Sequence, residues 1–164
     1  MQQDIGTFRP LSLRPHWTQY IISQTHWLIL CIALFAIYFN IDMIIKVVFL
    51  WAGTALLFFL LYQALYLARV EYIVTGEQII YLHGVLSHST DYMELYRVID
   101  YQQHRSLMQQ MAGLKTVIIY SGDRNTPVMH LIGMREQMDV VYEIRQRVEY
   151  NKTMRHVYEI TNRL

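Results

Sequence analysis

The stretch Val47–Ala68, VVFLWAGTALLFFLLYQALYLA, decides the architecture of this chain. It lies between Lys46 and Arg69 and contains no Asp, Glu, Lys or Arg. As an α-helix, which rises about 1.5 Å per residue, it is long enough to cross the roughly 30 Å hydrocarbon core of a lipid bilayer. The stretch therefore predicts a transmembrane helix over residues 47–68.

A second apolar stretch precedes it, and we place this span at about residues 20–40. Four polar residues, Ser23–His26, interrupt it before an apolar run at 27–39, and we place them near one membrane interface. The connection at 40–46 is too short to hold a domain, so we expect two antiparallel neighbouring helices that form a transmembrane hairpin. Two core helices of a soluble bundle would each need a polar face, and neither stretch has one.

Positive charges flank the hairpin unevenly. Arg9 and Arg14 precede the first span and Arg69 follows the second, whereas the connection holds only Lys46. Cytoplasmic loops carry an excess of Lys and Arg, so both termini are predicted to lie in the cytoplasm. A cleaved signal peptide explains the first stretch poorly, because it lacks a small-x-small cleavage site and a second span follows directly.

The composition bounds the remaining possibilities. The chain has 164 residues, which leaves room for one compact domain beside the hairpin. Its charged fraction of 16% lies below the 25% or so of a typical soluble domain. The net charge of +1 gives no electrostatic reason to expect a nucleic-acid partner. The single cysteine, Cys31, falls in the first span, where we expect a buried, unreactive thiol.

After Arg69 the pattern changes to short segments rich in β-branched and aromatic residues, separated by turn residues. A short helical turn is expected at 107–111, ended by Gly113. Strands are predicted at 70–75, 78–83, 85–92, 97–102, 115–120 and 127–132. Short strands at about ten-residue spacing indicate a β-sandwich or a small barrel.

The C-terminal part has the spacing of a helix. Apolar residues recur there at intervals of three and four, which places them on one helical face: Met134, Met138, Val141, Ile144 and Val148. We expect this helix to pack on a sheet and to stop at Asn151. A helical tail over 151–164 follows, with an apolar set of its own: Met154, Val157, Tyr158 and Leu164.

The segment YIVTGEQIIYLHGVLSHSTDYMELYRVIDYQQHRSLMQQMAGLKTVIIYSG, which follows the hairpin, resembles the bacterial pleckstrin-homology (PH) domain family of small membrane proteins. The matching positions are Tyr72 and Thr75, then 84–86, 95–100 and 113–118. The resemblance implies a membrane-anchored α+β protein of the bacterial inner membrane. A two-helix transmembrane hairpin would be followed by a PH-like β-sandwich of two nearly orthogonal sheets, capped by the C-terminal helix.

These expectations divide the chain into four parts. Residues 1–19 form a cytoplasmic N-terminal segment and residues 20–68 the transmembrane hairpin. Residues 69–150 form the PH-like domain, and residues 151–164 the helical tail.

Motifs that would indicate catalysis are missing from the sequence. It has no His-Glu-x-x-His, no cysteine pair, no Gly-x-Ser-x-Gly and no Gly-rich phosphate loop. His83 and His88 flank Gly84 and could approach each other, but scattered strand histidines are typical of surfaces. His26 is the one ionisable group well inside an apolar run, and its polar neighbours place it near the interface. We predict a protein that is not an enzyme and that holds no metal or cofactor.

Two functions stay open. Eukaryotic relatives that bind phosphoinositides have clustered Lys and Arg in the first hairpin loop. In this chain that loop is Thr75–Gln78, which is short and carries Glu77. Phosphate binding needs concentrated positive charge, which this loop lacks. A lipid-headgroup-binding or membrane-sensing module is therefore kept as the alternative function and is not the favoured one. The favoured function is a scaffold or assembly subunit, within a larger bacterial envelope complex, whose partners are the bilayer, further copies of itself or other membrane-complex subunits.

The candidate contact residues come in two groups. In the spans, small residues permit close approach of helices. In the tail, apolar residues exceed what a capping helix requires. The full set is Ala33, Ala36, Gly53, Ala55, Met154, Val157, Tyr158 and Leu164.

Overall fold

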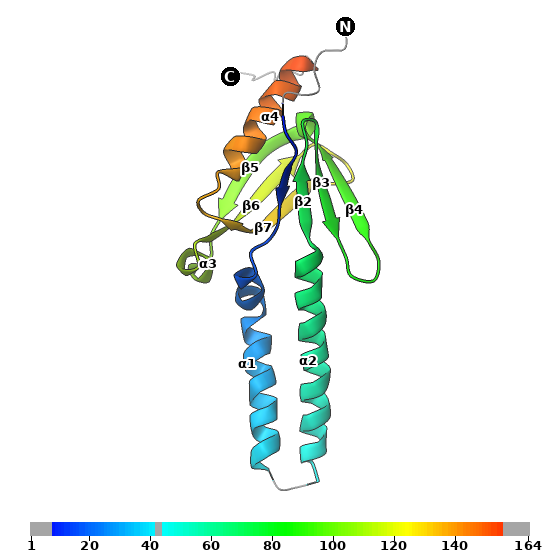
Figure 1. Ribbon diagram of the computed structural model, residues 1–164, viewed down its shortest axis with the longest axis vertical. Coiled ribbons are helices and arrows are strands. Elements are labelled where there is room, and N and C mark those ends of the chain that lie inside the picture. Colours follow the sequence, from blue (N-terminus) through cyan, green and yellow to red (C-terminus); the bar gives the residue numbers. More distant parts are fainter. Residues whose placement is uncertain (1–7, 42–43, 156–164) are drawn as a thin grey trace, which may run out of the picture.

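The computed structural model describes residues 8–41 and 44–155. Two long helices, α1 (Thr18–Asn40) and α2 (Lys46–Arg69), pack side by side as an antiparallel hairpin, and the β-rich domain sits at one end of the pair (Figure 1). Both helices are long and apolar enough to cross a membrane. Their bounds lie within two residues of the predicted spans, and the helical hairpin is confirmed.

Contact between the two helices depends on one of the predicted small residues. Gly53 is buried, and a Cβ atom there would lie 3.2 Å from the ring of Phe35. Cys31 is buried in the same interface. The other small residues predicted for helix contact, Ala33, Ala36 and Ala55, are exposed on the outside of the pair.

The N-terminal segment contains a strand that the sequence did not reveal. Strand β1 (Leu11–Leu13) pairs antiparallel with β2 (Glu71–Val74), with Leu13 opposite Tyr72. Leu13 is buried in the core of the domain. The hairpin is therefore inserted between the first two strands of the sheet, and the segment before it is part of the domain.

The remaining elements follow the predicted order. The first sheet has the order β1-β2-β3-β4 and the second β5-β6-β7, and both are antiparallel. Their two inner faces bury one apolar cluster, which includes Ile79, Leu95 and Ile119. The bounds are β3 (Gln78–His83), β4 (Ser89–Glu94), a 3₁₀ turn (Leu95–Arg97), β5 (Val98–His104), α3 (Leu107–Met111), β6 (Leu114–Ser121) and β7 (Val128–Arg135).

The C-terminal helix, α4 (Val140–Met154), begins and ends later than expected. Met134 belongs to β7, and the side chain of Asp139 caps the helix by accepting a hydrogen bond from the Tyr142 amide at 3.1 Å. The helix does not stop at Asn151, whose buried amide donates to the Gly76 carbonyl at 2.6 Å.

Of the predicted tail residues, Met154 is exposed at the end of α4, whereas Val157, Tyr158 and Leu164 lie outside the described residues. Ile144 and Val148 of α4 are buried in the core cluster, so the helix caps the sheets as predicted. Two long apolar helices, two antiparallel sheets and this helix confirm the α+β layout.

Gly133 joins the domain to the hairpin. Its backbone has φ +65°, a left-handed conformation that glycine adopts without strain. Its carbonyl accepts a hydrogen bond from the His16 amide at 3.0 Å. A Cβ atom at Gly133 would lie 2.8 Å from the Cβ of Gln19, in the first turn of α1. Only a residue without a side chain lets α1 approach β7 this closely.

Candidate functional site

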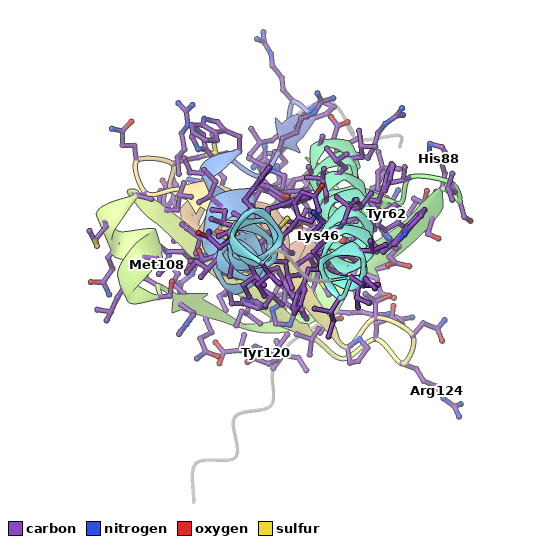
Figure 2. All side chains as sticks on the ribbon, turned by 90° about the horizontal axis from the view of Figure 1, so that it is seen from below. Lys46, Tyr62, His88, Met108, Tyr120 and Arg124 are labelled. Atoms are coloured by element: carbon purple, nitrogen blue, oxygen red, sulfur yellow. The ribbon has the colours of Figure 1, made fainter. Side chains whose placement is uncertain are left out.

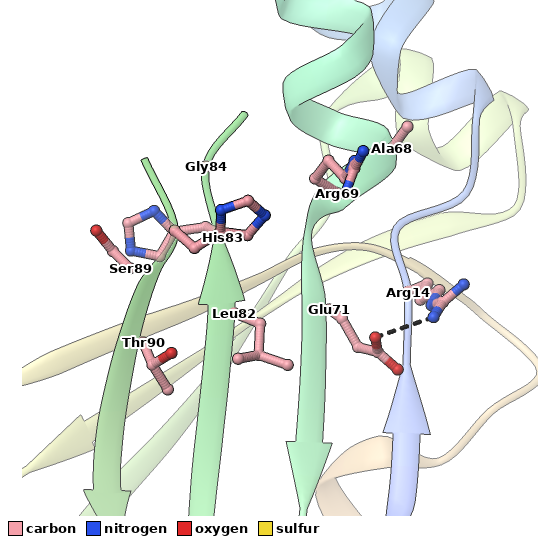
Figure 3. Close-up of a pocket in the computed structure, with 10 residues that line it drawn as sticks. Arg14, Ala68, Arg69, Glu71, Leu82, His83, Gly84, Ser89 and Thr90 are labelled. Atoms are coloured by element: carbon pink, nitrogen blue, oxygen red, sulfur yellow. Dashed lines mark hydrogen bonds and ion pairs between the residues drawn. The ribbon is translucent and has the colours of Figure 1, made fainter. Parts of the chain in front are cut away.

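A groove lies where the domain meets α2 (Figure 3). The end of β1, the start of β2 and the loop between β3 and β4 come together there and enclose about 320 Å³. The groove therefore combines residues that are far apart in the sequence. Its lining is Arg14, Ala68, Arg69, Glu71, Leu82, His83, Gly84, His88, Ser89 and Thr90.

Charge in the groove is mostly positive. Arg14 and Arg69 are exposed there, and Glu71 is the one acidic side chain of the lining. Glu71 accepts hydrogen bonds from Ser12 at 2.5 Å and from Arg14 at 2.9 Å. These two bonds hold the pKa of Glu71 below its ordinary value. Glu71 is therefore ionised at neutral pH and offsets part of the charge of Arg14, which leaves Arg69 as the stronger attraction for an anion.

His83 is held in place by two hydrogen bonds. Its Nδ1 lies 3.2 Å from the hydroxyl of Tyr66 on α2, and its Nε2 lies 3.2 Å from a carboxylate oxygen of Asp91 on β4. The ring also stacks on Tyr81, with 4.5 Å between ring centroids. His83 and His88 do line one groove. However, the described residues contain no group of three or more His, Cys, Asp or Glu side chains that could hold a metal ion.

Two tyrosines behind His83 continue the stack. Tyr81 lies 4.9 Å from Tyr72, centroid to centroid, and the Tyr72 hydroxyl donates to the His130 carbonyl at 2.8 Å. Burial raises the pKa of Tyr72 to about 12 and raises that of Tyr81 as well. Both phenols therefore stay protonated at neutral pH. The two rings support His83 from behind, while Arg14, Arg69, Ser89 and Thr90 give the groove positive charge and hydroxyl groups for binding an anion.

The acidic turn Thr75–Gln78 is not the first hairpin loop, and that sequence-based assignment was wrong. It joins β2 to β3 and lies beside α4, where Glu77 is 3.9 Å from Arg155. Because β1 is the first strand, the first hairpin loop is the connection between β1 and β2, which holds both long helices. The turn with Glu77 is thus at the other end of the sheet from the groove (Figure 1).

One outer strand of the second sheet, β5, has an open edge. Among the described residues β5 pairs with β6 alone, and its residues from Gln102 to His104 are exposed. Ile99 is 65% exposed at a bulge near the start of the strand. β4 is the corresponding outer strand of the first sheet. Unpaired backbone groups along such an edge can pair with a strand from another chain.

Two antiparallel sheets capped by a helix, with a pair of apolar helices inserted after the first strand, define a PH-like module on a helical hairpin. Residues 19–148 match the family model described as "Bacterial PH domain". The chain belongs to this family, as its sequence resemblance implied. No curated protein and no solved structure matches the chain.

Proposed function

We propose that this protein is a membrane-anchored scaffold or assembly subunit. In this proposal the hairpin crosses the bacterial inner membrane, and the PH-like domain on the cytoplasmic side binds another protein chain through the open edge of β5. The partner is a further copy of the protein or another subunit of a membrane complex. The protein has no catalytic role and uses no cofactor.

Membrane insertion is supported by the outer surface of the hairpin. Ile32, Trp51 and Phe58 are each about two-thirds exposed or more, at 69%, 71% and 67%. Soluble monomers rarely expose a continuous apolar patch of more than a few hundred Å². Lipid tails would cover this surface without the need for a polar helix face.

Both termini are expected on the cytoplasmic side, because Arg9, Arg14 and Arg69 lie at the domain end of the hairpin and Lys46 at the other. In a Cys31→Ala background, single cysteines are introduced by Ile44→Cys at the hairpin tip and by Thr90→Cys in the domain. A membrane-impermeant maleimide added to intact spheroplasts should label position 44 and not position 90. Labelling at position 90 alone would contradict the proposed orientation.

The observation that carries the scaffold proposal is the edge of β5. An exposed edge strand is a template for pairing, and proteins usually protect such edges with charges, Pro or a covering element. β5 has a bulge and one charged residue, Asp100, at its start, but its remaining residues, 101–104, include no Asp, Glu, Lys, Arg or Pro. A protein partner that adds a strand here would satisfy the open backbone groups.

We therefore expect a photo-reactive amino acid at Gln103 to cross-link in native membranes. The matched control is the same amino acid at Arg124, an exposed residue in the turn between β6 and β7. Cross-linked species heavier than the monomer should form from position 103 and not from position 124, and peptide sequencing would identify the partner. Equal yields at both positions, or no adduct from position 103, would rule out the edge as the binding surface.

A second candidate function, lipid-headgroup binding, is favoured by the position of the groove. Arg14 and Arg69 lie where the domain meets the hairpin, so they would face the headgroups of the bilayer that the hairpin crosses. Arginine binds phosphate oxygens with charge-assisted hydrogen bonds. Native mass spectrometry of the full chain from nanodiscs should then show fewer retained anionic lipids for Arg69→Gln, and an unchanged number for Arg124→Gln. Equal retention would exclude the groove as a headgroup site.

A further inference from the structure

We propose that the domain also rests on the bilayer through two apolar contacts, helix α3 and the loop between β3 and β4, one on each side of the hairpin. Both would enter the layer between headgroups and acyl chains. This inference rests on the proposed membrane insertion of the hairpin, and it adds a membrane-bound surface to the domain itself.

The first contact is α3, where three of the four exposed side chains are apolar and the fourth is Gln110. Leu107 is 79% exposed, Met108 49% and Met111 91%. A capping box formed by Ser106 and Gln109 fixes the start of this short helix. Its five residues form little more than one turn, and three large exposed apolar side chains on one turn are more than a soluble surface requires.

The inward side of α3 is polar and is tied to the hairpin. Gln109 is 4% exposed, and its amide nitrogen donates to the side chain of Gln19 at 3.0 Å and to the hydroxyl of Thr116 at 2.9 Å. Gln19 in turn donates to Ser23 at 2.9 Å. Buried amides with satisfied hydrogen bonds define one orientation. With Gln109 turned inward, the three apolar side chains must face away from the domain.

The depth of α3 follows from its contact with α1. The sulfur of Met108 lies 4.0 Å from the hydroxyl of Thr25. Thr25 is seven residues after Thr18, which corresponds to about 10 Å along the helix. Met108 therefore sits beside the polar residues Ser23–His26, at the level where the hairpin is expected to enter the bilayer. Figure 1 shows α3 beside the beginning of α1.

The second contact is the tight loop between β3 and β4. Gly84 has φ +107°, and a Cβ atom there would lie 1.9 Å from the Ser87 carbonyl oxygen, so the loop turns sharply. Leu86 at its tip is 91% exposed. The hydrogen bond between the Tyr66 hydroxyl and His83 holds the loop next to α2. Figure 2, viewed from below, shows Met108 and His88 on opposite sides of the hairpin.

The bilayer is the occupant that these positions favour. Both contacts flank the apolar hairpin at its domain end, where α1 and α2 meet the domain. Interfacial helices bury an apolar face about 5–10 Å into the boundary between headgroups and chains. A membrane that surrounds the hairpin would meet Met111 and Leu86 together, whereas one protein partner would have to reach around the hairpin to cover both.

The test uses the full chain in nanodiscs with single bimane labels in a Cys31→Ala background. The labels are placed by Met111→Cys and Leu86→Cys, with Arg124→Cys as a control at the end of the domain far from the hairpin and Phe58→Cys as a control within the hairpin. Each labelled protein must keep the thermal midpoint of its parent. Fluorescence is compared in phosphatidylcholine and in the same lipid with a nitroxide near the top of the acyl chain.

Loss of fluorescence at positions 58, 86 and 111, but not at 124, is the expected result. Loss at 58 without loss at 86 or 111 would overturn the two contacts and leave the membrane-inserted hairpin standing. No loss at position 58 would overturn the proposed insertion itself. Cross-linking between two copies at position 111, with no loss of fluorescence there, would assign α3 to a protein interface and also overturn the proposal.

Discussion

Gly133→Ala is expected to destabilise the junction between hairpin and domain. Alanine at φ +65° strains the backbone by about 1–3 kcal/mol. Its Cβ atom would also lie 2.8 Å from the Cβ of Gln19, which has little freedom to move because it belongs to the first turn of α1. We expect a lower thermal midpoint of the full chain in detergent, together with faster hydrogen exchange at the His16 amide, which bonds to the Gly133 carbonyl at 3.0 Å.

Gly113→Ala is the matched control for this variant. Gly113 has nearly the same backbone conformation, φ +64°, but a Cβ atom there would have no neighbour within 4 Å. Gly113→Ala should therefore introduce the backbone strain without a steric clash, and hydrogen exchange at the His16 amide should stay slow. Equal losses of stability in both variants, with His16 unaffected in each, would mean that the contact of α1 with β7 contributes nothing to the junction.

The hairpin could be predicted from the sequence because its physical constraint is local. The absence of charges over a length set by bilayer thickness marks each helix, and no distant residue takes part. The predicted spans 20–40 and 47–68 are therefore close to α1 (Thr18–Asn40) and α2 (Lys46–Arg69). Most of the strands could be predicted too, because runs of β-branched residues are likewise a local signal in the sequence.

The groove could not be predicted in this way, because it depends on pairing across the hairpin. Strand β1 is a Leu-Ser-Leu segment between Pro10 and Pro15, too short to give a periodic signal. It becomes a strand because Leu13 can be buried opposite Tyr72. Without β1, the first hairpin loop is misassigned. The antiparallel hairpin alone places Arg14 and Arg69 at the same end of the helices, but it does not predict that they line one groove.

The start of α4 was misassigned for a different reason. Met134 and Met138 are four residues apart, a spacing that fits a helix, yet Met134 is an inward-facing residue of β7. Asp139 was the usable signal, since Asp is favoured at helix N-caps and this one accepts the Tyr142 amide. Apolar spacing alone does not separate the end of a strand from the start of a helix.

Ile144→Ala is expected to have the largest effect on the domain. Ile144 is fully buried where α4 packs against the sheets, and shortening such a side chain costs about 2–5 kcal/mol through lost burial and the cavity left behind. Hydrogen exchange at the amides of β6, such as those of Val117 and Ile119, should become faster by the factor that corresponds to this loss in the free energy of unfolding. The control is Tyr142→Ala on the same helix, where the side chain is 56% exposed and the change should stay within about 0.5 kcal/mol.

Ile144→Ala also separates the folding of the domain from the insertion of the hairpin. Trp27 and Trp51 lie within the hairpin, whereas Trp17 lines a groove together with Met134 and Met138 of the domain. Trp17→Phe is therefore introduced into the parent and the variant, so that the remaining tryptophan fluorescence reports on the hairpin. In nanodiscs we expect Ile144→Ala to leave the tryptophan emission unchanged while the domain melts at lower temperature. In the proposed insertion, lipid contacts would hold the two helices, and the domain contacts them through Gly133 of β7, Gln109 of α3 and His83 of β3. A red shift of the emission when the domain unfolds would show instead that the hairpin needs the folded domain to keep its place in the bilayer.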